Sequence, residues 1–177
     1  MNGVFVYREP AKIVQDILQS ELSLSDGQVM FTNQKYLIPT NGLFIVVSYI
    51  GPSKVMSCAD EWVDDGFGGL TEIQSVVLFH TLQIDIMSYD DSARVRKEEI
   101  AMALRSLFSE SQQELYCMQI ARQPGAFTDT SFLEDTKMMT RYTTTVATSS
   151  VNRKQKPVGD FYTDFTRAVP PKVVVNA

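Results

Sequence analysis

The stretch that decides the fold is "FHTLQIDIMSYDDSARVRKEEIAMAL", which runs from Phe79 to Leu104. Its first half alternates apolar and polar residues, a pattern that predicts a strand with one buried face. The residues Asp90, Asp91 and Ser92 follow, and their side-chain oxygens can accept hydrogen bonds from the free N–H groups that begin a helix. The sequence therefore predicts a strand that passes through a short acidic turn into an amphipathic helix.

The strand pattern reaches back to Ile73 and ends at Tyr89. At about 3.3 Å per residue, such a strand would span roughly 55 Å, which is far longer than usual. We therefore expect it to twist strongly or to project beyond the core. The helix after Ser92 should bury one apolar stripe, formed by Ile100, Leu104, Leu107 and Phe108.

The remaining segments add a second helix and further strands. A helix should begin near Pro10, because apolar residues then recur at three- and four-residue spacing up to Leu22. Short strands are predicted at "QVMFTN", "LFIVVSYI" and "LYCMQIA", and a closing hairpin at 138–151 and 158–169, joined by "NRKQKP". The predicted fold is one α+β domain over residues 1–177. It has a mixed or antiparallel sheet, long β-hairpins and two main amphipathic helices packed on the sheet, with a C-terminal tail at 170–177.

Residues 53–71 form a candidate projecting arm. They show neither a sustained helical nor a sustained strand period, and they contain the run "DDGFGG" from Asp64 to Gly69. A segment of this length in a compact domain is often functional, and we favour a hairpin whose tip is this glycine-rich run. The candidate interface residues on the arm are Trp62, Asp64, Asp65 and Phe67.

Composition limits the function classes. The chain has 177 residues, 44% of them apolar, and a formal net charge of −5. An acidic chain lacks the concentrated lysine and arginine that grip nucleic acid. No apolar run approaches the roughly 20 residues of a membrane span, and no secretory signal is evident, so we expect a cytoplasmic protein. Cys58 and Cys117 match no metal or redox motif and are predicted to be reduced and part-buried.

The sequence contains only weak matches to catalytic and ligand-binding motifs. His80 is the only histidine, which excludes a Ser-His-Asp triad within one subunit and favours a hydrogen-bonded structural role. The acidic run 60–65 lacks the oxygen spacing of a calcium loop, and "GFGG" is not followed by the lysine and serine of a phosphate loop. The basic residues Arg153, Lys154 and Lys156 are predicted to lie in a solvated turn and are further interface candidates. We therefore predict no catalytic, cofactor or metal residues and a non-enzymatic protein.

The order of segments resembles one family. The strand "LQIDIMSYDD" followed at once by "SARVRKEEIAMALRSLF", with the later "MMTRYTTTVATSSV" and "GDFYTDFTRAV", is similar to the tail-terminator (tail-completion or neck) proteins of tailed bacteriophages. The resemblance covers roughly residues 73–169. It implies a hexameric ring that caps the tail tube, stops its polymerisation and joins it to the head connector, while DNA passes through the channel without specific binding. It also implies a place in the virion after assembly in the host cytoplasm.

Several alternatives stay open at this point. The first is another head–tail connector, stopper or minor tail protein of the same general build. The second is a small-ligand-binding module with a pocket under the sheet. The third is a metal-dependent protein in which acidic residues of the 60–65 run converge on an ion from several subunits. In that case the ion would bind only to the assembled protein.

Overall fold

The computed structural model describes residues 8–32, 39, 41–64, 69–121, 124–134 and 137–157. These residues form an α+β domain built on one mixed eight-stranded sheet, as predicted. The central order is β1-β2-β4-β8-β5, with β3 on β4 and with β6 and β7 on β8. The elements, in chain order, are α1 (Pro10–Glu21), β1 (Val29–Phe31), β2 (Phe44–Tyr49), β3 (Lys54–Asp64), β4 (Leu70–Ser88), α2 (Ser92–Arg96), α3 (Glu99–Ala103), α4 (Leu107–Leu115), β5 (Met118–Ile120), β6 (Thr128–Asp129), β7 (Phe132–Glu134) and β8 (Lys137–Pro157).

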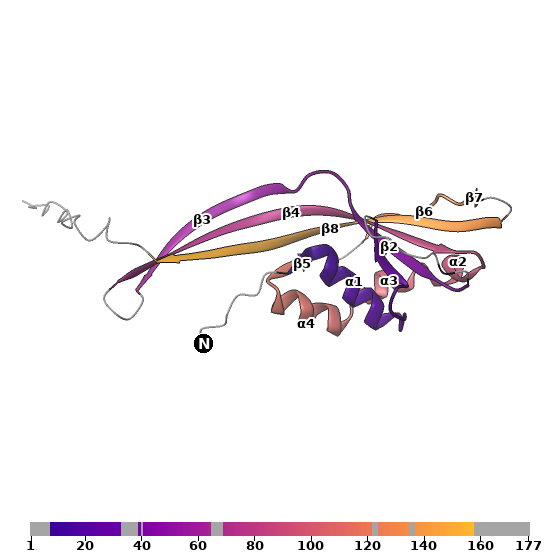
Figure 1. The fold of residues 1–177 in the computed structure, drawn as a ribbon, viewed down its shortest axis with the longest axis horizontal. Coiled ribbons are helices and arrows are strands. Elements are labelled where there is room, and N and C mark those ends of the chain that lie inside the picture. The colour runs from indigo at the N-terminus through magenta and orange to yellow at the C-terminus, as the bar shows by residue number, and fades with distance from the viewer. Residues whose placement is uncertain are drawn as a thin grey trace, which may run out of the picture.

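The long strand of the opening stretch is β4, and it has two parts. Residues 80–88 lie in the core between β2 and β8, whereas residues 70–79 extend away from it between β3 and β8 (Figure 1). Strand β8 follows β4 without a break in register, from Thr71↔Pro157 to Ser88↔Thr140. The expectation that the strand would project beyond the core is confirmed.

The core lies between one face of the sheet and the helices (Figure 1). Helix α1 begins with Pro10 at its first turn, and its side chains at three- and four-residue spacing are fully buried. Ile13 and Ile17 belong to the same buried cluster as Ile84 of β4. Burying each such side chain contributes roughly 1.5–3 kcal/mol. Gln15 also donates from Nε2 to the Val29 carbonyl at 2.5 Å, which ties α1 to β1.

The helix predicted after Ser92 is divided into α2, α3 and α4. The last break falls at Ser106, whose side chain accepts a hydrogen bond from the Ser109 N–H at 3.0 Å and so begins α4. Ile100 and Leu104 are buried as predicted, but Leu107 is 84% exposed. Its predicted place in the buried stripe is wrong, because a new helix start at Ser106 changes the direction in which the following side chains point.

The predicted turn "NRKQKP" is also wrong. Residues 152–157 belong to β8 and pair with β4. The ladder with β4 supplies hydrogen-bond partners for this backbone, so the basic side chains can stay in water without a turn. The predicted strand 158–169 and the tail 170–177 lie outside the described residues. The short strands predicted around β1, β2 and β5 are confirmed.

Candidate assembly interface

A three-stranded ribbon projects from the core, formed by β3, by residues 70–79 of β4 and by residues 148–157 of β8 (Figure 1). Every residue of β3 is exposed to solvent. The predicted arm 53–71 is therefore a hairpin, as expected, but it pairs along β4 with a third strand as well. A small sheet needs an apolar face or a packed helix for independent stability. A ribbon this exposed is a surface on which a partner could pack.

The ribbon has two open edges. Among the described residues, β3 has strand pairing only with β4, and residues 152–157 of β8 likewise have strand pairing only with β4. The outward N–H and C=O groups of such edges are templates for pairing with another strand. Strand β5 covers the β8 edge at residues 148–150, nearest the core, and the Val151 N–H donates to the Cys117 carbonyl just before β5 at 3.2 Å. The β3 edge is interrupted only by a register shift between Val55 and Ser57.

Large apolar side chains are exposed along this ribbon. Val55 and Met56 are 63% and 65% exposed at the base of β3, and Trp62 is 47% exposed near its outer end. Asp64 is two positions after Trp62, so both side chains lie on the same face of β3. Leu70 of β4 pairs with Asp64 and lies on that face too. Exposed apolar clusters mark contact surfaces, and tryptophan is frequent among the residues that dominate binding.

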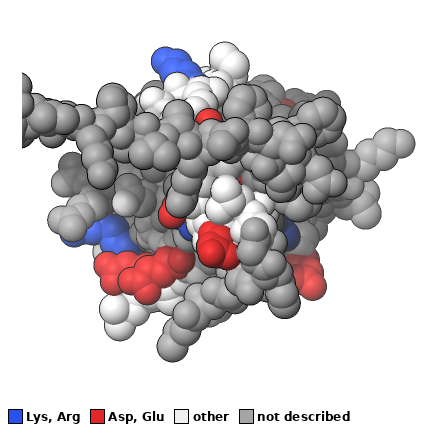
Figure 2. All heavy atoms as spheres, turned by 90° about the vertical axis from the view of Figure 1, so that its left-hand side faces the viewer, with Lys and Arg blue, Asp and Glu red and all other residues white. Residues whose placement is uncertain are grey.

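The charges of the ribbon are separated between its two edges. Strand β3 carries Asp60, Glu61 and Asp64 near its outer end, and the outer part of β8 carries the three basic residues Arg153, Lys154 and Lys156. The registers through β4 place Asp60 level with Lys154 on one face, and Glu61 points to the other. Charged side chains of both signs reach the surface on the end view from the ribbon side (Figure 2).

Most of the predicted interface residues thus lie on this ribbon, although they come from distant parts of the sequence. Trp62 and Asp64 are on β3, and the three basic residues are on β8. Asp65 and Phe67 lie outside the described residues. The basic residues are in a strand and not in the predicted turn.

His80 of β4 joins β8 and the loop just before β3 at the place where the ribbon leaves the core. Its Nδ1 lies 2.9 Å from the Ser53 hydroxyl and its Nε2 lies 3.2 Å from the Ser150 hydroxyl. The side chain is buried, and burial lowers its pKa against a smaller opposing effect of the Glu9 carboxylate. The prediction that this histidine is hydrogen-bonded is confirmed.

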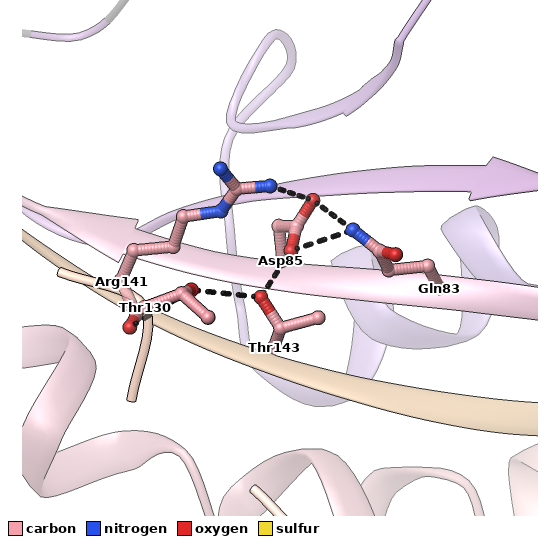
Figure 3. A network of polar contacts seen from close by, with 5 residues as sticks. All are labelled: Gln83, Asp85, Thr130, Arg141 and Thr143. Atoms are coloured by element: carbon pink, nitrogen blue, oxygen red, sulfur yellow. Dashed lines mark hydrogen bonds and ion pairs between the residues drawn. The ribbon is translucent and has the colours of Figure 1, made fainter. Parts of the chain in front are cut away.

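A second polar network fastens β4 to β8 on the sheet face opposite α1 (Figure 3). Asp85, only 4% exposed, accepts hydrogen bonds from Arg141 Nη2 at 2.8 Å and from Thr143 Oγ1 at 2.6 Å. Gln83 Nε2 adds a contact at 2.9 Å, and Thr130 lies 2.9 Å from the Thr143 hydroxyl. Sequence reasoning missed this network. Its one signal was an acidic residue between two isoleucines in a long strand.

A groove of about 1290 Å³ runs beside α4 and β5 under the base of the ribbon. Its lining mixes apolar residues such as Leu104 and Ile120 with the polar residues Glu110, Gln113 and Glu114. The groove is open to solvent, whereas ligand sites generally enclose most of the ligand.

The described part of the chain has neither a metal-binding cluster nor a membrane-spanning helix. No group of three or more His, Cys, Asp or Glu residues there could hold a metal ion. Asp60 and Glu61 point to opposite faces of β3, which separates the acidic run. No described helix is long and apolar enough to cross a membrane. Cys58 and Cys117 are free, but both are exposed, so their predicted partial burial is wrong.

Comparison with known proteins adds no relative: the chain matches no model of a known protein family, and a search of curated proteins also found no match.

Proposed function

We propose that this protein is a structural subunit of a tailed phage particle, the terminator that forms a ring on the tail tube. The observation that carries the proposal is the projecting ribbon, in which all of β3 is exposed and whose two outer strands have strand pairing on one side only within the described residues. The hydrogen bonds of His80 lie where the ribbon leaves the core, and the network around Asp85 joins β4 to β8 within the core. A rigid core with a fixed, uncovered projection suits a subunit that is completed by its neighbours.

The asymmetry of the subunit supports ring formation. A head-to-tail contact uses two different patches on each copy, and it closes into a ring when the rotation between copies divides a full turn. The ribbon offers two such patches, an acidic edge and a basic edge. The two ends of the resulting ring would differ, so one could contact the tail tube protein and the other the head connector.

The order of segments supports the phage setting. The strand and helix of the opening stretch resemble those of tail-terminator proteins, for which a hexameric ring is implied. In the proposed ring DNA passes through the channel without specific binding. The net charge of −5 fits that role, since each phosphate gripped by lysine or arginine would add affinity and slow the passage.

One rival stays in the virion: a connector, stopper or minor tail protein would use the same ribbon at another position. The open groove beside α4 favours a second candidate, a small-ligand-binding protein. Its mixed polar lining and its openness make it the weaker one, because ligand sites generally enclose most of the ligand. The metal-dependent alternative requires ligands from several subunits.

The function is tested by the length of tail tubes. Tail tube protein is polymerised with and without this protein, and tube lengths are measured by electron microscopy. A terminator should give shorter tubes that stop growing once one end is covered. A chain deleted for residues 54–79 cannot serve as the control, because the deletion also removes the ladder partner of residues 149–157 of β8. The chain with Trp62→Ser and Leu70→Ser is preferable, since both side chains are exposed. Unchanged tube lengths with the unmodified protein would contradict the proposal.

A further inference from the structure

We propose that neighbouring copies join by strand addition, with the acidic edge of β3 in one copy pairing with the basic edge of β8 in the next. This inference rests on the proposed ring and identifies the contact that closes it. The occupant of each open edge is a second copy of this chain.

The two edges match in direction and length. Strands β3 and β8 are both antiparallel to β4, so they run the same way along the ribbon. Residues 58–63 of β3 and residues 152–157 of β8 both pair with residues 71–76 of β4. At equal height, two copies side by side would therefore form a parallel pair of six residues on each strand. This pair is about 20 Å long at about 3.3 Å per residue.

The charges select this pairing over the others. Within one chain, the acidic and basic rows lie on either side of β4, about 10 Å apart for strands spaced about 4.8 Å. That distance exceeds the screening length of about 8 Å at physiological salt. Pairing between copies would bring the rows to about 5 Å and place Asp60 beside Lys154 of the next copy.

Pairing of identical edges is disfavoured. Two β3 edges would bring Asp60 and Glu61 against the same residues of another copy, and two β8 edges would bring Lys154 and Lys156 together. Like charges on directly opposed residues destabilise a sheet. The contact is therefore head-to-tail, which is the type that generates rings and excludes simple two-fold dimers.

Two charge-reversed chains test the pairing. Asp60→Lys with Glu61→Lys makes both edges basic, and Lys154→Glu with Lys156→Glu makes both edges acidic. All four side chains are exposed, so both chains should fold, which circular dichroism checks. Each alone should need at least a tenfold higher concentration to assemble than the unmodified chain. An equimolar mixture should assemble again, because the acidic edges of one chain then meet the basic edges of the other.

Native mass spectrometry in solution and electron microscopy of tube ends record the assembly. The matched control is Glu21→Lys with Asp26→Lys, which reverses two exposed acids in and just after α1, away from the ribbon, and should assemble like the unmodified chain. The pairing is refuted if the reversed chains assemble normally, if only one of them is impaired, or if no combination associates. The second outcome would mean that another segment or protein covers one edge.

The two proposals fail separately. Rings that cap tubes but do not respond to the charge changes would refute edge pairing and leave the terminator function standing. A mixture that assembles as expected, from chains that never shorten tubes, would refute the terminator function and leave edge pairing standing.

Discussion

Replacing Asp85 with asparagine should weaken the attachment of β8 to β4 at the centre of the sheet. The Asp85 carboxylate is 4% exposed and accepts hydrogen bonds from Arg141, Thr143 and Gln83. Asparagine retains one acceptor oxygen but removes the charge that Arg141 faces. Breaking a buried ion pair from one side costs about 3–5 kcal/mol. The Arg141 side chain is 31% exposed, so water screens part of this loss. We expect a destabilisation of about 2–3 kcal/mol.

That loss is large enough to measure. In a domain of this size, 1 kcal/mol shifts the melting temperature by about 2–4 °C, so Asp85→Asn should lower it by about 5–10 °C. Thermal unfolding and urea unfolding, each followed by circular dichroism, measure the melting temperature and the free energy of unfolding. Thr143→Val is the matched control: it removes one hydrogen bond to Asp85 and should cost only about 1 kcal/mol.

A double-mutant cycle identifies the interaction. Arg141→Met combined with Asp85→Asn should cost less than the sum of the two single changes, because contacting residues are not additive. If the free energy of unfolding of the Asp85→Asn variant lies within about 0.5 kcal/mol of that of the unmodified chain, the network contributes little to stability. The idea that it fastens β8 to β4 at the centre of the sheet would then be refuted.

Two further predictions concern charge. Burial lowers the pKa of His80, so the stability that neutral His80 contributes is complete above the ordinary pKa of 6.5 and is lost as the pH falls below that value toward the folded pKa. The melting temperature of the protein should therefore fall from pH 8 to pH 5, and that of the His80→Asn variant should fall less steeply. Equal slopes would contradict a role for His80. Asp64→Lys with Asp65→Lys should leave ring formation intact, because both positions follow the paired residues 58–63. The resulting rings should bind duplex DNA at low salt. Unchanged DNA affinity would show that these acids do not face the channel.

Local patterns predicted the elements that bury one face. Helix α1 has apolar residues at three- and four-residue spacing, and the half of β4 near Ile84 alternates, because each packs on one side against the core. The glycine-rich run after Asp64 predicted the hairpin between β3 and β4. These predictions needed no contact between distant parts of the chain.

The sequence-based predictions are wrong where an element does not bury one face against the core. The outer part of β8 has no alternating apolar face, because the ribbon there is in water on both sides, so Arg153 and its neighbours resembled a turn. The break at Ser106 rests on one side-chain hydrogen bond, which apolar periodicity does not reveal.

The sequence predicted the residues of the candidate interface but not their arrangement. Its residues were named, but the opposition of acidic β3 and basic β8 depends on the register that sets Asp60 and Lys154 level with the same residue of β4, Gln74. The network at Asp85 likewise joins residues 56 positions apart. Neither arrangement follows from spacing along the chain.

The central claim is that this chain forms a ring that ends the tail tube, and electron cryo-microscopy of tubes assembled with it tests that claim most directly. The predicted image has one ring of six copies at one end of each tube, with the ribbons of adjacent copies in contact. Tubes with bare ends, or copies bound along the tube wall without a closed ring, would contradict it.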